Sequence, residues 1–140
     1  MRVIITSLAL ILSLFITPSF AARVEAKVDL SQQKMHVYKG GRLQYTFKIS
    51  SGKAGFRTPT GRWGVTRMHR KYFSRQYHGA RMPNSIFFHR GYAIHGTNKV
   101  SRLGRTASHG CIRLAPGNAR ALFNLVQANG RSNFRVSIRH

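Results

Sequence analysis

Apolar and polar residues alternate along several short segments of this 140-residue chain, and this period of two constrains its fold more than any other feature. Residues 24–29 read Val-Glu-Ala-Lys-Val-Asp, and residues 35–38 and 43–49 repeat the pattern on either side of Gly40-Gly41. Successive side chains of a strand point to opposite faces of a sheet, and paired glycines suit a hairpin turn. We therefore expect three strands here, the last two joined as a hairpin. Further strands are expected to start at Trp63 and to cover 86–89, 92–95 and 134–138.

The segment 116–129 has the period of a helix instead. Its apolar residues recur at i, i+3, i+4 and i+7, with Pro116 at the start and Gly130 after the end as a stop signal. These residues are Ala119, Leu122, Phe123 and Val126. The sequence therefore predicts a mainly β domain with one principal helix. The helix follows Cys111 closely, so it can pack behind that residue and fix its position.

The charge of the chain excludes several classes of enzyme. The chain has 24 Lys and Arg but only two acidic residues, Glu25 and Asp29, so its formal net charge is +22. A glycosidase needs paired carboxylates, a magnesium or calcium site needs carboxylate oxygens, and a Ser-His-Asp hydrolase needs an acid behind its histidine. The seven histidines show no close metal-ligand spacing, and a single cysteine rules out a Cys-rich zinc site. We expect no metal and no cofactor.

The N-terminus predicts an exported protein. Arg2 precedes an apolar run over 3–16, and the small residues that follow are typical of a secretory signal peptide, residues 1–21, cleaved after Ala21. An uncleaved membrane anchor is the alternative, although the run is shorter than the roughly 20 apolar residues that span a bilayer. The remainder, residues 22–140, suffices for one domain. We expect it to act in the periplasm or cell envelope as a monomer.

Export also changes what the charge implies. A strongly basic chain commonly binds nucleic acid, but an exported one meets peptidoglycan stems, lipopolysaccharide and acidic phospholipid head groups. The basic residues are spread along the whole chain, so they do not form a disordered basic tail, and the charge could also serve solubility alone. A stretch over 68–84 mixes basic and aromatic residues without clean periodicity. We interpret it as a flap over a substrate groove, with an ordinary solvated loop as the alternative.

The single cysteine is the best candidate for chemistry. Cys111 lies in the run Ser-His-Gly-Cys-Ile-Arg-Leu at 108–114, and His95 lies a short loop upstream. A thiol needs a nearby base and a positive field to become a thiolate, and His95 and the basic chain can supply them. Gly110 lets the backbone turn and leaves its N–H facing a developing oxyanion. Because acids are scarce, a carbonyl within 96–97 is the natural group to orient the imidazole. The combination predicts acyl transfer, whereas either residue alone is more often structural.

These motifs resemble the signature of the L,D-transpeptidases with a YkuD-type catalytic domain. The resemblance covers Val24 to Ile138, and Arg113 stands where some members of that family carry asparagine. It rests on Thr58-Pro59-Thr60-Gly61-Arg62-Trp63, Met82-Pro83, Ile94-His95-Gly96-Thr97, Leu103-Gly104 and residues 108–114.

The resemblance implies a β-sandwich or barrel-like catalytic fold and a reaction on peptidoglycan stem peptides. Cys111 would attack the carbonyl between the third residue of a tetrapeptide stem and its terminal D-alanine, and His95 would serve as general base and then as general acid. Backbone N–H groups around Gly110 and Cys111 would hold the oxyanion, and the carbonyl just after the histidine, that of Gly96, would orient the ring. The acyl group would then pass to an acceptor amine, typically on a second stem.

Three further residues are candidates for substrate binding: Ser108, His109 and Arg113. His109 either shapes the turn before the cysteine or lines the substrate site beside Ser108. Arg113 either pairs with a stem carboxylate, which matches a guanidinium in two-point geometry, or is one more surface arginine.

The acceptor is left open by the sequence. With water as acceptor the protein would be an L,D-carboxypeptidase or peptidoglycan amidohydrolase, and with a protein amine it would attach an outer-membrane protein to the wall. Outside the enzymes, the alternative is a non-catalytic cationic protein that binds anionic envelope polymers. No nucleic-acid partner is expected.

Overall fold

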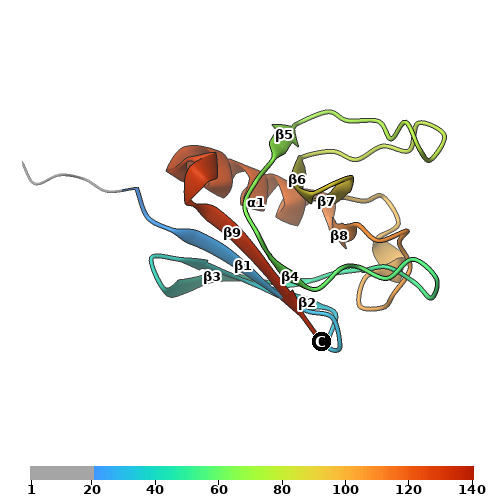
Figure 1. Cartoon of the computed structure of the whole chain (residues 1–140), viewed down its shortest axis with the longest axis horizontal. Coiled ribbons are helices and arrows are strands. Elements are labelled where there is room, and N and C mark those ends of the chain that lie inside the picture. The colour runs from blue at the N-terminus through green and yellow to red at the C-terminus, as the bar shows by residue number, and fades with distance from the viewer. Residues whose placement is uncertain (1–20) are drawn as a thin grey trace, which may run out of the picture.

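Nine strands form two sheets in the computed structural model, which describes residues 21–140 (Figure 1). The first sheet has the strand order β3-β2-β1-β9-β4 and the second has the order β5-β6-β7-β8. The strands are β1 Val24–Asp29, β2 Lys34–Lys39, β3 Arg42–Lys48, β4 Gly61–Trp63, β5 Arg67–His69, β6 Ser85–His89, β7 Tyr92–Gly96, β8 Ile112–Leu114 and β9 Phe134–Arg139. The helices are α1 Pro116–Asn129 and two short 3₁₀ turns, η1 Val100–Arg102 and η2 Arg131–Asn133.

The expected signal peptide falls on residues 1–21, which, apart from Ala21, lie outside the described residues. Within residues 21–140, no helix has the length and apolar character needed to cross a membrane.

The first sheet contains the hairpin and the strands predicted over 24–29, 35–38, 43–49 and 134–138, whereas the strand expected to start at Trp63 ends there, as β4. β2 and β3 are antiparallel and are joined by Gly40 and Gly41, whose φ angles of +56° and +77° give the two left-handed positions of a tight hairpin turn. β1 pairs with β2 on one side and runs parallel to β9 on the other. The mainly β architecture with one principal helix is thus confirmed.

The apolar face expected over 43–49 is buried only in its second half. Phe47 and Ile49 are in the core, whereas Leu43 and Tyr45 are 55% and 38% exposed. β3 is the edge strand of its sheet, and its register against β2 shifts between Val37 and Tyr38. The shift changes the pairing of Arg42 and Leu43 only, whereas Tyr45 keeps the register of Phe47 and is exposed on the edge strand.

The helix α1 joins both sheets into one core. Its four predicted apolar residues are all buried, Pro116 occupies its first turn, and Gly130 ends it with φ +87°. Burying a Leu or Phe side chain stabilises the fold by about 1.5–3 kcal/mol, so packing against the sheets holds α1 in place. The shared core includes Val28 of β1, Ile94 of β7, Leu114 of β8, Leu122 of α1 and Val136 of β9.

Two strands were not predicted, and one of them positions the cysteine. β5 and β8 have three residues each, which is too short for a period of two to show in the sequence. β8 is parallel to β7, and its other edge bonds to the segment after β3. There the Ser50 N–H donates to the Arg113 carbonyl at 3.0 Å, and the Arg113 N–H donates to the Ser50 carbonyl at 2.8 Å. These two bonds connect the sheets beside Cys111.

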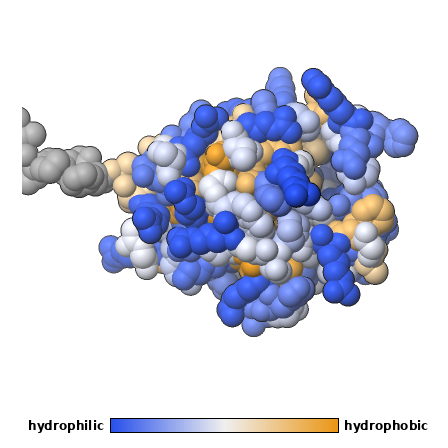
Figure 2. Space-filling model, in the orientation of Figure 1, coloured by the Kyte–Doolittle hydropathy of each residue, from blue (hydrophilic) through white to orange (hydrophobic). Residues whose placement is uncertain are grey.

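Hydrophilic residues cover most of the face seen in Figure 2, and apolar residues form small separate patches on it. This agrees with basic residues that are dispersed along the chain.

Candidate active site

Cys111 and His95 line the same cleft, which has a volume of about 830 Å³ and is called the cysteine cleft below. In the parallel pair of β7 and β8, His95 lies opposite Arg113. Cys111 directly precedes β8 and lines the same cleft as His95 and Arg113. The three side chains expected to act together therefore meet in one cleft.

Residues 108–111, the cysteine turn, are held by side-chain hydrogen bonds. The Ser108 hydroxyl donates to the Cys111 carbonyl at 2.6 Å and accepts from the Gly110 N–H at 3.0 Å. The Thr58 hydroxyl donates to the Gly110 carbonyl at 2.7 Å. Gly110 has φ +121°, and a Cβ built on it would lie 2.5 Å from Tyr92 Cε1. Only glycine fits this position, so the backbone before the nucleophile candidate is rigid.

These bonds correct two of the sequence expectations. The Gly110 N–H is bound to Ser108 and is not free for an oxyanion, because a serine hydroxyl two residues earlier satisfies it locally. Ser108 borders the cleft, but its side chain is fully buried and both roles of its hydroxyl are used, so it shapes the turn and offers nothing to a substrate. Among residues 21–140, no acceptor is found for the N–H of Cys111, which remains the donor candidate beside the sulfur.

His95 is held by the segment in which an orienting carbonyl was expected. Its side chain is buried, and its Nδ1 lies 2.8 Å from the Gly96 carbonyl. A carbonyl can only accept, so Nδ1 carries the proton and Nε2 keeps a free lone pair. Gly96 also permits close packing, since a Cβ there would lie 3.1 Å from Pro83 and 3.3 Å from Ala119 of α1. The imidazole is thus fixed in one tautomer.

The resting state of the pair is neutral. Burial lowers the pKa of His95 to about 4, with a smaller contribution from the positive charge of Arg113, while the Gly96 hydrogen bond opposes the shift. Burial raises the pKa of the Cys111 thiol, although the Ala93 backbone and Arg113 act in the other direction. We expected the basic chain to favour a thiolate, but burial outweighs the one nearby cation. A neutral thiol therefore faces an unprotonated base.

Arg113 is a half-buried cation without a carboxylate partner in the described chain. Glu25 pairs with Arg62 and Asp29 with Arg139, both elsewhere in the first sheet. The cysteine cleft has no acidic lining residue, and its cationic lining residues are Arg81, Lys99, Arg113 and Arg120. Such a cleft favours a ligand that carries carboxylates.

The expected flap forms one wall of the cysteine cleft. Residues 74–84 provide many of its lining residues, and β5 precedes them at 67–69. His109 stacks on Tyr77 with ring centroids 4.4 Å apart and meets Phe56 edge-on at 4.8 Å. His109 thus lines the cleft and also connects the flap to the cysteine turn. The ring contacts of Tyr77 and Phe56 with His109 were not predicted. Aromatic residues in a loop have no periodicity that would indicate which residue they contact.

No group of three or more His, Cys, Asp or Glu side chains within the described range, 21–140, is arranged to hold a metal ion.

Comparison with known proteins identifies the family. The model of the L,D-transpeptidase catalytic domain, YkuD, matches residues 23–138. A Bacillus licheniformis protein that carries the name L,D-transpeptidase YkuD is 33% identical over 111 residues, which are 79% of this chain and 62% of that protein. The chain belongs to the L,D-transpeptidase catalytic-domain family.

Solved structures share the fold. An L,D-transpeptidase from Mycobacterium tuberculosis superposes with a TM-score of 0.76 at 20% identity, over 85% of this chain and 58% of that one. One from Stackebrandtia nassauensis superposes with a TM-score of 0.74 at 22% identity, over 92% of this chain and 62% of that one. This chain therefore spans about three fifths of the length of these relatives.

Proposed function

We propose that this chain is an exported cysteine L,D-transpeptidase that acylates itself on a peptidoglycan tetrapeptide stem, releases D-alanine and passes the acyl group to an acceptor amine. The observation that carries the proposal is the cysteine cleft itself. The proposal is supported by a cleft that is lined by Cys111, by His95 with a free Nε2, and by Arg113, which has no carboxylate partner among residues 21–140.

The first half-reaction forms a thioester. His95 Nε2 accepts the thiol proton while Cys111 Sγ attacks the carbonyl carbon between the third stem residue and the terminal D-alanine. The negative charge that develops on the carbonyl oxygen is held by the free N–H of Cys111. When the tetrahedral intermediate collapses, the carbon–nitrogen bond breaks, and the imidazolium returns its proton to the amine of the leaving D-alanine.

The second half-reaction reverses these roles. An acceptor amine attacks the thioester carbonyl, His95 removes a proton from that amine, and the thiol leaves with the proton that His95 returns. A new amide bond replaces the thioester, and the enzyme regains its neutral pair. Since no external energy source is used, the bond energy of the original D-alanine amide is preserved in the product.

Arg113 binds a carboxylate of the stem. Its guanidinium is half-buried beside Cys111, and burial lowers its pKa, which shows that the surroundings do little to solvate the charge. A bound carboxylate would stabilise it through two parallel hydrogen bonds. The other cations of the cysteine cleft, Arg81 on the flap and Arg120 on α1, suit a substrate with more than one carboxylate.

The donor test uses purified protein, a synthetic tetrapeptide stem and product analysis by mass spectrometry. We expect release of D-alanine and a cross-linked product with wild-type protein and with the control Ser101→Ala, which lies on η1 outside the cleft lining. Cys111→Ala should release none. A tripeptide product without cross-link would assign water as the acceptor, and activity in Cys111→Ala would exclude the mechanism.

A β-lactam test examines the thiol directly. One solved LD transpeptidase is in complex with imipenem, and an L,D-transpeptidase from Mycobacterium tuberculosis carries a faropenem-derived adduct. We expect one imipenem adduct on this chain by intact-protein mass, and none on Cys111→Ala, because the chain has a single cysteine. A folded, reduced wild-type protein without mass increase would contradict the proposal.

A further inference from the structure

A second concave site lies on the first sheet, apart from the cysteine cleft. Its volume is about 270 Å³, and none of its lining residues lines the cysteine cleft. It is lined by Arg23, Arg62, Trp63, Gly64 and Arg135, and it is called the arginine cleft below. Arg23 directly precedes β1, Arg62 lies on β4 and Arg135 lies on β9, and these three strands are neighbours in the order β1-β9-β4. The sheet thus brings three guanidinium groups from distant parts of the chain to one hollow.

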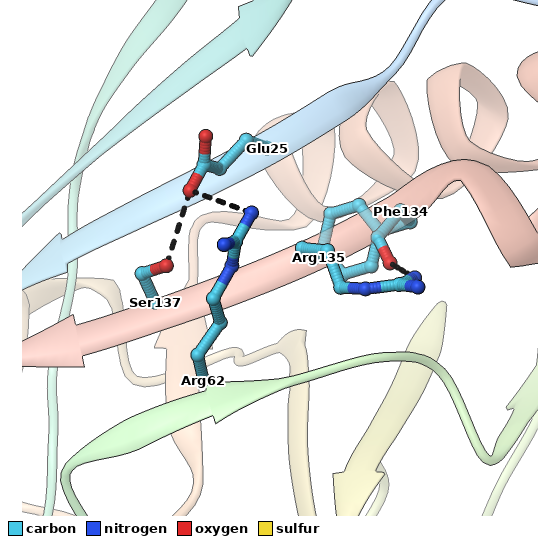
Figure 3. A network of polar contacts seen from close by, with 5 residues as sticks. All are labelled: Glu25, Arg62, Phe134, Arg135 and Ser137. Atoms are coloured by element: carbon cyan, nitrogen blue, oxygen red, sulfur yellow. Dashed lines mark hydrogen bonds and ion pairs between the residues drawn. The ribbon is translucent and has the colours of Figure 1, made fainter.

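The Arg135 guanidinium is held in place before any ligand arrives. Its Nη1 donates to the Phe134 carbonyl at 2.7 Å (Figure 3) and to the Ser132 carbonyl at 3.0 Å. It also lies over Gly64, where a Cβ would be 3.4 Å from Nη1. Both bonds use one nitrogen, so Nη2 and Nε keep donors for a ligand. A fixed guanidinium loses little conformational entropy when it binds.

Arg62 reaches across β9 towards the only nearby carboxylate. Figure 3 shows its side chain extending from β4 to Glu25 on β1, where Nη2 lies 3.7 Å from Oε1. The Arg62 side chain is 54% exposed, so this ion pair contributes little, and Glu25 also accepts a hydrogen bond from Ser137 at 3.1 Å. Three guanidinium groups and one carboxylate leave a local charge of about +2, which no group in the described chain neutralises.

We propose that the arginine cleft binds a phosphate monoester. A monoester carries a charge of about −1.5 to −2 near pH 7 and three acceptor oxygens, which match the net charge and the donors of the hollow. Guanidinium groups are the side chains that recognise phosphate oxygens by paired hydrogen bonds. At about 270 Å³, the hollow is large enough for a phosphate together with the small polar group that carries it. The half-buried Trp63 also lines the hollow.

The test uses the sole tryptophan of the chain as its reporter. Titration of the full chain with glucose 6-phosphate at physiological salt should give a saturable change in Trp63 fluorescence, and glucose alone should give none. The double variant Arg23→Gln/Arg62→Gln should bind at least about tenfold more weakly, since a charged hydrogen bond contributes about 1.5–3 kcal/mol. The control Arg42→Gln, to be compared with Arg23→Gln alone, removes one exposed charge from β3 of the same sheet and should leave the Kd unchanged.

The source of the phosphate is decided by a second arm. Vesicles that contain phosphatidic acid in phosphatidylcholine present the same monoester on a lipid, and sedimentation with them should be competed by glucose 6-phosphate if the arginine cleft is used. Binding to vesicles without binding of the soluble probe would assign a lipid head group.

Three results would overturn the proposal: no saturable response to either probe, an unchanged Kd in the double variant, or an equal loss in Arg42→Gln. Thermal unfolding checks that the variants are folded, and Arg23→Gln alone, at an exposed side chain, serves if the double variant is not. Because the arginine cleft shares no residue with the cysteine cleft, Cys111→Ala should bind the probes as wild type does. The outcome is therefore independent of the transpeptidase proposal.

Discussion

Acidification should destabilise this protein mainly through one side chain, His95. Its pKa is about 4 in the folded chain and 6.5 as an unperturbed histidine, because burial disfavours the charged ring. Above pH 6.5 both the folded and the unfolded state leave the ring neutral, and the stability contributed by this difference is fully present. Between pH 6.5 and 4 the unfolded state binds a proton that the folded state does not, so this stability is lost as the pH falls.

The magnitude follows from the shift. A difference of about 2.5 pH units corresponds to about 3 kcal/mol at 1.36 kcal/mol per unit, and this loss is complete just below pH 4. The side chain is 6% exposed, so solvent screening reduces the value little. Most proteins also lose stability in acid through many carboxylates, but this chain has only Glu25 and Asp29. The histidine contribution should therefore be unusually easy to isolate.

Urea unfolding of wild type and His95→Gln, followed at several pH values from 4 to 7.5, measures it. Glutamine does not titrate, and every other group is common to the two proteins. The free energy of unfolding of wild type relative to the variant should fall by about 3 kcal/mol from pH 7 to pH 4. If that difference stays constant across the range, His95 is not a buried neutral histidine and the assignment of a ready base is wrong.

Three further predictions concern the cysteine cleft. His95→Ala should lower kcat by about 10²–10⁴. His109→Ala loses only ring stacking and should lower kcat less. The reverse order would assign the base to His109. Gly110→Ala should disrupt the turn and lower the melting temperature. The control Gly117→Ala lies on α1, where a Cβ meets nothing within 4 Å, so it should be neutral or stabilising by up to about 1 kcal/mol. Equal effects of the two substitutions would refute the steric argument. Arg113→Gln should raise KM for a stem with free carboxylates more than it lowers kcat, and steady-state kinetics would contradict this if kcat carried the whole loss.

Much of the fold could be predicted because local patterns agree with tertiary packing. The helix over 116–129 was predicted with all its buried residues, since its apolar spacing matches the stripe that both sheets cover. The strands over 24–29 and 134–138 were found because one of their faces is buried throughout. β5 and β8 were missed because three residues are too few to show a period of two. Their extended backbone depends on pairing with strands elsewhere in the chain, β6 and β7.

The candidate site was predictable in its residues but not in its hydrogen bonds. Cys111 and His95 were singled out by their chemistry, and the sheet pairs β7, which carries His95, with β8, which directly follows Cys111. The N–H of Gly110 was assigned to an oxyanion because its chain position suits that purpose, yet the Ser108 hydroxyl takes it. Such short-range competition depends on χ angles that a sequence does not specify. The stack of Tyr77 on His109 likewise depends on how residues 68–84 return over the cleft, which no period encodes.

The effects of Arg113 on its two neighbours, which oppose each other in the transfer of a proton between them, decide how its role should be understood. Its positive charge lowers the pKa of Cys111 and also lowers the pKa of His95. Transfer of a proton from the thiol to the imidazole gains from the first effect and loses from the second, so the two largely cancel in the energy of the ion pair that attacks the substrate. A residue that leaves this proton transfer nearly unchanged gains its importance from what it binds. We therefore propose that the Arg113 guanidinium serves as a substrate-binding group and not as an activator of the thiol. In the proposed mechanism, the buried pair stays neutral until a substrate carbonyl lies against the sulfur, and only then do the charges separate.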